Sequence, residues 1–187
     1  MASRYPGPLR DQPLPIELHN TLYATTRGER CDGIADPAAL RAWLAAVASD
    51  LPVPAQSVAT ERSAAFRALR DAVRSALHAT LDAKPVPPRA RRALNDTAAA
   101  CPRSVQLAPD GTRRVRYHAE DSTQIVLAAI AHETIGLISG PRARDLRACG
   151  APGCVLAFLK DHPRRTWCST TCGNRARQAR HYARHHD

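Results

Sequence analysis

The sequence is poor in aromatic residues and contains no long apolar run. Phe, Trp and Tyr make up 4% of the 187 residues, so a folded core must consist mainly of Ala, Leu, Val and Ile. No segment approaches the roughly 18 apolar residues that a membrane-spanning helix needs. Prolines and charges interrupt residues 1–20, where a signal peptide would carry its apolar segment. We therefore expect a cytoplasmic protein with reduced thiols and no membrane partner.

Motifs of the common enzyme classes are also missing. The nine glycines never form G-x-G, which argues against a glycine-rich phosphate loop, and no G-x-S-x-G nucleophile elbow is present. His132-Glu133 begins like a metalloprotease motif, but Gly136 stands where the second histidine is needed. Cys31 and Cys101 are isolated thiols. We therefore do not expect an enzyme, although a site in the N-terminal part remains an alternative without a supporting motif.

Arginine, in contrast, is abundant and concentrated near the C-terminus. Lys and Arg number 27 against 17 Asp and Glu, a net charge of +10, and only two of the 27 are lysines. When the chain is divided at the structure-breaking pair Gly140-Pro141, residues 142–187 hold ten of the basic and three of the acidic residues, hence +7 of the charge. This asymmetry predicts two parts, 1–140 and 141–187, and favours a nucleic-acid partner. A solvated basic surface is the alternative.

Apolar periodicity predicts that the N-terminal part is mainly helical. Helices are expected at about 17–23, 36–47, 66–81, 89–100 and 123–138, with Asp36 and Ser122 as caps of the second and the last. The last helix is apolar nearly all round, so we expect it at the centre. Residues 104–117 alternate about Pro109-Asp110-Gly111, which is typical of a hairpin. The fold class is therefore α+β, with one β-hairpin in a mainly helical domain.

Four cysteines near the C-terminus have metal-ligand spacing. Cys149, Cys154, Cys168 and Cys172 form the pattern C-x4-C-x13-C-x3-C, and glycines between the first two allow a tight turn beneath an ion. Four soft thiolates in a reducing compartment predict one structural zinc ion per chain, because a full set of protein ligands leaves no open position. An iron–sulfur cluster, disulfides or free thiols remain alternatives.

The segment after Cys168 predicts a basic helix beside this site. At about 100° per residue, Ala176, Ala179 and Ala183 fall near Cys172 and can pack under the zinc, whereas three arginines form a ridge to one side. We call Arg177, Arg180 and Arg184 the arginine ridge, and expect it, with Arg164 and Arg165, to contact phosphates. The remaining candidates for DNA contacts are Asn174, Arg175 and His181. A solvated helix flank is the alternative.

The end of the chain resembles a known family. Residues 167–175 read Trp-Cys-Ser-Thr-Thr-Cys-Gly-Asn-Arg, similar to the CGNR zinc fingers, whose Cys-Gly-Asn-Arg motif lies here at 172–175. Such fingers usually follow an ABATE domain, and the openings Glu17–Leu22 and Asp36–Leu44 are similar to that domain. His19 departs from it, because an apolar residue is expected there. Residues 160–163 replace a linker richer in Ser and Arg.

The resemblance implies both a fold and a function. It implies a small treble-clef-like finger, with a knuckle at Cys149–Cys154, a short strand pair and a helix from about Cys172. It also implies a stress-induced bacterial transcription regulator that binds double-stranded DNA through the finger. The ABATE-like domain would sense a small-molecule effector or form a homodimer. A zinc-stabilised module that binds protein or RNA remains the main alternative.

Overall fold

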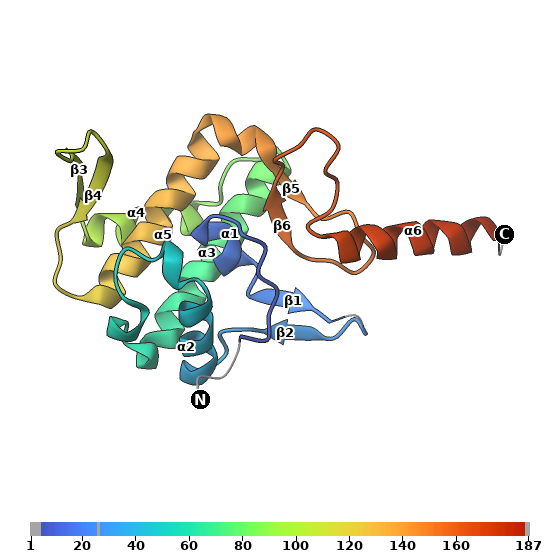
Figure 1. Cartoon of the computed structure of the whole chain (residues 1–187), viewed down its shortest axis with the longest axis horizontal. Helices are drawn as coiled ribbons and strands as arrows, with labels where there is room; N and C mark the ends of the chain where they lie inside the picture. Colours follow the sequence, from blue (N-terminus) through green and yellow to red (C-terminus); the bar gives the residue numbers. More distant parts are fainter. Residues whose placement is uncertain (1–4, 26, 186–187) are drawn as a thin grey trace.

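Helices dominate the N-terminal part of the fold, as the apolar periodicity predicts. The computed structural model describes residues 5–25 and 27–185 (Figure 1). The helices of this part are α1 (Leu14–His19), α2 (Pro37–Ala46), α3 (Ser63–Leu81), α4 (Pro88–Ala100) and α5 (Ser122–Ser139), with 3-10 turns at Ala48–Asp50, Ala55–Ser57 and Thr60–Arg62. A further 3-10 turn, Pro141–Asp145, follows α5 and leads into the C-terminal part. Two antiparallel hairpins join them, β1–β2 (Leu22–Ala24 and Arg30–Asp32) and β3–β4 (Arg103–Leu107 and Arg113–Tyr117).

Helix α5 lies in the middle of this bundle because its sequence is apolar on nearly every side. Val126 and Ile130 are fully buried, and the helix packs against α1, α3 and α4. Helix α3 buries Phe66 and Leu77 on one face, and the Phe66 ring meets Trp43 of α2 edge-on, with the ring centroids 6.4 Å apart. The mainly helical α+β class is therefore confirmed.

The length and composition of α5 would also suit a membrane helix. Its 18 residues have a mean hydropathy of 1.2, so the chain does contain one segment of that length, contrary to expectation. The side chains responsible for this hydropathy include Ile125, Val126, Leu127 and Ile130, which are buried in the fold. A buried core helix meets the same criterion, so α5 gives no evidence of a membrane span.

Two local expectations are wrong. The first helix covers Leu14–His19 rather than 17–23, because the chain leaves the helix at Asn20 and enters strand β1, where Tyr23 pairs with Cys31. The β1–β2 hairpin was therefore not predicted. The cap of α5 is Asp121 rather than Ser122, since the Asp121 carboxylate accepts from Thr123 N at 2.8 Å.

Other predicted elements lie where the sequence places them. Asp36 caps α2 by accepting a hydrogen bond from Ala39 N at 2.8 Å. The hairpin expected within 104–117 is β3–β4, in which Val105 faces Val115. Its turn places Gly111 at a φ of 78°, a conformation that costs glycine little.

The C-terminal part is small and lies against the helical bundle. Its elements are β5 (Leu146–Ala148), β6 (Ala157–Leu159) and α6 (Thr170–His185). Leu146, Ala157 and Leu159 are buried in the same core as the N-terminal helices. In Figure 1, α6 projects from one end of the molecule, and the β3–β4 hairpin lies at the opposite end.

Candidate metal centre and nucleic-acid interface

A tight loop between β5 and β6 brings the first two cysteines together. The strands pair with Ala148 opposite Ala157, and Cys149 N donates to Leu156 O at 2.9 Å, which continues the ladder. Cys154 N then donates to Ala151 O at 3.0 Å. Gly153 has a φ of 70°, which most side chains disfavour, so the glycine-containing spacing closes the knuckle.

The second pair of cysteines approaches this knuckle at the start of α6. Ser169 Oγ accepts from Cys172 N at 3.2 Å and so helps to fix the first turn of the helix. The Sγ–Sγ distances are 3.9 Å from Cys154 to Cys168, 3.5 Å from Cys168 to Cys172 and 3.8 Å from Cys172 to Cys154. Together with Cys149, these cysteines offer four sulfur atoms within 4.8 Å of one another.

The chemistry and spacing of this donor set fit zinc. A tetrahedral ion with Zn–S bonds of about 2.3 Å separates its sulfurs by about 3.8 Å, close to the distances found here. No disulfide joins any of the four cysteines. Hydrogen bonds from Cys154 and Cys168 lower the pKa of the Cys149 thiol. The same contacts with Cys149, together with burial, raise the pKa of the Cys154 and Cys168 thiols. A divalent cation would favour the ionised form of every sulfur.

Further groups surround the sulfurs. Cys168 N donates to Cys149 Sγ at 3.4 Å, and Arg175 Nη2 donates to Cys172 Sγ at 3.5 Å. Such donors stabilise thiolates and orient them, as outer partners of metal ligands do. Arg175, a candidate DNA contact, is half-buried and engaged with the metal cluster.

Trp167 connects the cysteine cluster with the arginine ridge. Its half-buried ring packs against that cluster, and the guanidinium carbons of Arg177 and Arg180 each lie 5.9 Å from the ring centroid. A Cβ atom at Gly173 would meet Trp167 Cε3 at 3.2 Å, closer than ordinary contact. The glycine of the Cys-Gly-Asn-Arg motif therefore lets the indole lie against the helix, a role that its position beside Cys172 did not reveal.

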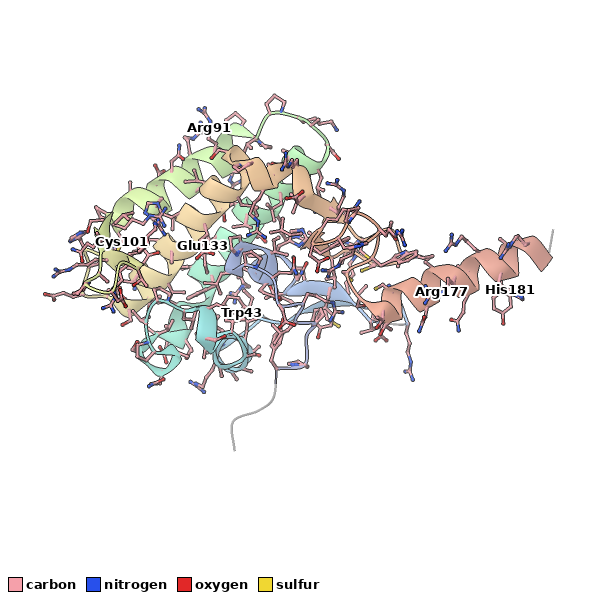
Figure 2. All side chains as sticks on the ribbon, turned by 45° about the horizontal axis from the view of Figure 1, so that its top comes forward. Trp43, Arg91, Cys101, Glu133, Arg177 and His181 are labelled. Carbon is pink, nitrogen blue, oxygen red and sulfur yellow. The ribbon has the colours of Figure 1, made fainter. Side chains whose placement is uncertain are left out.

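The arginine ridge lies on an exposed helix. Arg177, Arg180 and Arg184 are all exposed, and Figure 2 shows Arg177 and His181 on the part of α6 that extends beyond the body of the protein. Arg177 Nη2 donates to the Asn174 side-chain oxygen. Arg184 Nε donates to the carbonyl of Arg180 at 3.3 Å. The structure thus keeps these predicted residues together on one helix.

The two arginines before Trp167 have different environments. Arg164 is exposed in the loop. Arg165 is held inside the finger, where Nη1 donates to Asp161 at 2.8 Å, Nη2 donates to Cys168 O at 3.1 Å, and the guanidinium lies over the Phe158 ring. Arg165 therefore stabilises the loop that leads to Cys168.

The alanine stripe is only partly correct. Ala176 is buried within the cysteine cluster, as expected. Ala179 and Ala183 are exposed, although they line an open groove with Ala176, Trp167 and the knuckle residues Gly150 and Pro152. Helical winding places the three alanines on one stripe, whereas the finger buries that stripe only at Ala176, near the start of α6.

Comparison with known families agrees with this geometry. The ABATE family, described as "Putative stress-induced transcription regulator", matches residues 12–141. The CGNR zinc finger matches residues 145–185. No match was found among curated proteins. Together with the four converging sulfurs, the finger match indicates that the cluster takes one zinc ion.

Proposed function

The chain belongs to the ABATE family and ends in a CGNR zinc finger, and we propose that it is a cytoplasmic, zinc-dependent regulator that binds double-stranded DNA. Residues 1–140 form the regulatory part, and residues 141–187 form the DNA-binding finger. Both matched families are regulator or zinc-finger types, which supports a binding function over an enzymatic one. Homodimerisation of the regulatory part is compatible with this proposal.

Zinc has a structural role in this proposal. All four cysteines, Cys149, Cys154, Cys168 and Cys172, are its ligands, so no position is left for a substrate or an activated water. When bound, the ion would cross-link the knuckle to the first turn of α6. The residues around it then set the direction in which α6 leaves the protein.

The observation that carries the proposal is the basic, exposed character of α6. The helix contains Arg175, Arg177, Arg180 and Arg184 and no acidic residue. Within the part of the chain that the structure describes, no carboxylate forms an ion pair with the arginine ridge. The sixteen residues of α6 form a helix about 24 Å long. The major groove of DNA is wide enough to admit a single α-helix. The ridge is therefore suited to phosphates along the groove.

The remaining candidates have distinct roles in this arrangement. Arg164 contacts phosphate from the loop before Trp167. In this proposal Asn174 and His181 read bases, since an amide can match the edge of adenine and a ring nitrogen can donate or accept. For Asn174 this requires its side-chain oxygen to leave the hydrogen bond from Arg177. Arg165 and Arg175, which are engaged inside the finger, act mainly by keeping its shape.

A salt titration of duplex binding tests this function. Replacing Arg177, Arg180 and Arg184 together with Ala should weaken binding on every sequence and lower the slope of log affinity against log salt by about 3, because each phosphate contact contributes about 1. The matched control replaces three exposed arginines of α4, Arg89, Arg91 and Arg92, which removes the same charge elsewhere. That variant should keep the wild-type slope.

The outcome also separates the alternatives. If the zinc-loaded ridge variant binds duplex DNA with unchanged affinity and slope, the ridge is a solvated flank and the finger is a protein-binding module. Tighter binding to single-stranded RNA than to duplex DNA would instead favour an RNA-binding module.

A further inference from the structure

A cavity of about 420 Å³ lies where the β1–β2 hairpin, helix α3 and the zinc knuckle meet. The hairpin lines it with Leu22, Tyr23, Arg30 and Cys31, α3 with Arg74 and His78, and the finger with Ala148 and residues 154–156. Its size is in the range of small-molecule sites. Because both parts of the chain form its walls, a molecule bound there would contact both.

The charge of this cavity favours an anion. Among the described residues, Arg30 and Arg74 line it and no carboxylate does, while Cys154 on the knuckle side is a zinc ligand whose thiolate charge the ion partly offsets. Among the described residues neither guanidinium forms an ion pair, and the only hydrogen bond from Arg74 goes to the carbonyl of His19 at 2.9 Å. Burial, together with the neighbouring Arg70 and Arg30, lowers the pKa of Arg74. A half-buried guanidinium without a carboxylate partner is a natural binding group for an anionic ligand.

The rest of the lining specifies an apolar body for that anion. Leu22, Val155 and Leu156 present aliphatic surface, and Tyr23 adds an aromatic side chain. Burial and the nearby Arg74 lower the pKa of His78, so at neutral pH it is a neutral donor or acceptor. Two cations beside an aliphatic wall match a carboxylate on a small hydrocarbon group better than a bare inorganic ion.

Hydrogen bonds connect the cavity with the finger. His78 Nε2 lies 3.2 Å from His19 Nε2, and His19 Nδ1 lies 3.0 Å from the Asn20 side-chain oxygen. Asn20 in turn holds both polar backbone atoms of Ala157 in strand β6 at 3.0 Å. A ligand that fixes Arg74 and His78 would therefore also fix the groups that hold the finger against the bundle.

We propose that this cavity is an effector site for a small organic carboxylate with an apolar body, and that the ligand ties the finger to the helical bundle. This inference builds on the proposed function, because it places the effector of the regulatory part. Arg30 and Arg74 bind the carboxylate, and the aliphatic wall receives the hydrocarbon.

Calorimetric titration of the zinc-loaded protein with benzoate tests the site without DNA. Benzamide, which has the same shape but no charge, should bind at least tenfold more weakly, and inorganic phosphate should also bind more weakly than benzoate. Arg30→Gln and Arg74→Gln should each reduce benzoate affinity at least tenfold. The control is Arg27→Gln, an exposed arginine of the same hairpin that does not line the cavity, and it should bind as wild type.

Hydrogen exchange provides a second measurement. Saturating benzoate should slow amide exchange in residues 155–160 of the wild type and not of Arg30→Gln. If Arg74→Gln fails to fold, the benzoate affinity of the Arg30→Gln variant, which changes an exposed residue, still tests the site. Equal binding of benzoate and benzamide, tighter binding of phosphate, or unchanged affinity in Arg30→Gln would each overturn the site. Because no DNA is present, these results are independent of whether α6 binds DNA.

Discussion

Asn20 and Ala157 exchange two hydrogen bonds of 3.0 Å each, although they lie 137 residues apart in the chain. The amide NH₂ of Asn20 donates to the carbonyl of Ala157, and its oxygen accepts from the Ala157 N–H. One side chain thus takes the place of a neighbouring strand at the edge of β6. Two residues on, Gln12 Oε1 accepts from Leu159 N at 2.6 Å, so the bundle supplies the edge partners that the finger lacks.

Removal of the Asn20 amide should loosen this docking. Asn20 and Ala157 are both fully buried, so Asn20→Ala leaves a backbone N–H and a C=O without partners, which should cost about 2–3 kcal/mol of unfolding free energy. Denaturant unfolding of the zinc-loaded protein measures this loss, and amide exchange should become faster in residues 155–160. The control Asn95→Ala, at an exposed position of α4, should leave stability unchanged or slightly higher. Equal stabilities of the two variants would contradict the docking role.

This docking marks the limit of what the sequence could predict. The long helices follow from apolar periodicity, since Phe66 and Leu77 recur on the buried face of α3. Strands β1 and β2 have three residues each, too few to show alternation. The partnership of Asn20 with Ala157 has no local signal, because a polar residue beside a helix end is usually exposed.

The candidate site was more predictable in its metal part than in its surroundings. Cysteine spacing alone identified the four sulfurs, because few other structures require that pattern. The packing of Trp167 against Gly173 depends on how the loop returns to the helix, which spacing does not encode. The exposure of Ala179 depends on where the body ends, which helical winding cannot show.

Zinc removal should affect the two parts differently. Structural zinc contributes on the order of 10 kcal/mol to small fingers, so a chelator or Cys172→Ser should unfold residues 149–185 while helices α2 to α5 persist. The bundle should nevertheless lose stability, because Leu146, Ala157 and Leu159 contribute to its core. Circular dichroism with zinc analysis measures both effects, and Cys31→Ser, outside the cluster, should retain zinc and structure. Cooperative loss of all helices on chelation would contradict the division at residue 140.

Acid should destabilise the fold partly through His19. Burial and the nearby Arg74 lower the pKa of His19 from 6.5 to about 3, so the folded protein keeps it neutral while the unfolded chain takes up a proton. This contribution to stability is present above about pH 6.5 and is lost progressively as the pH falls towards 3, by at most about 1.4 kcal/mol per pH unit.

The variant His19→Gln removes this proton uptake. Between pH 6.5 and 4.5, its unfolding free energy should fall less steeply than that of the wild type, although it starts lower because buried contacts are lost. Both proteins carry the same cysteines, so protonation of the zinc site affects both. The exposed His118→Gln serves as control and should follow the wild-type slope. Parallel pH profiles for the His19 variant and the wild type would show that His19 is not the group responsible.

Two helical glycines allow a matched test of the contact between Trp167 and α6. Gly136 lies on the exposed side of α5, and a Cβ there would meet nothing within 4 Å, so Gly136→Ala should raise the unfolding free energy by about 1 kcal/mol through helix propensity. At Gly173 the same methyl group would lie 3.2 Å from Trp167 Cε3 and 3.4 Å from Arg177 Nη1. The half-exposed indole can move away, so Gly173→Ala should gain less stability and shift the Trp167 emission.

Trp43, the other tryptophan, is fully buried in the bundle and gives a constant background. Denaturant unfolding and fluorescence of both zinc-loaded variants decide the matter. Equal gains in stability with unchanged emission would mean that Gly173 is an ordinary helical glycine and that the indole does not depend on it.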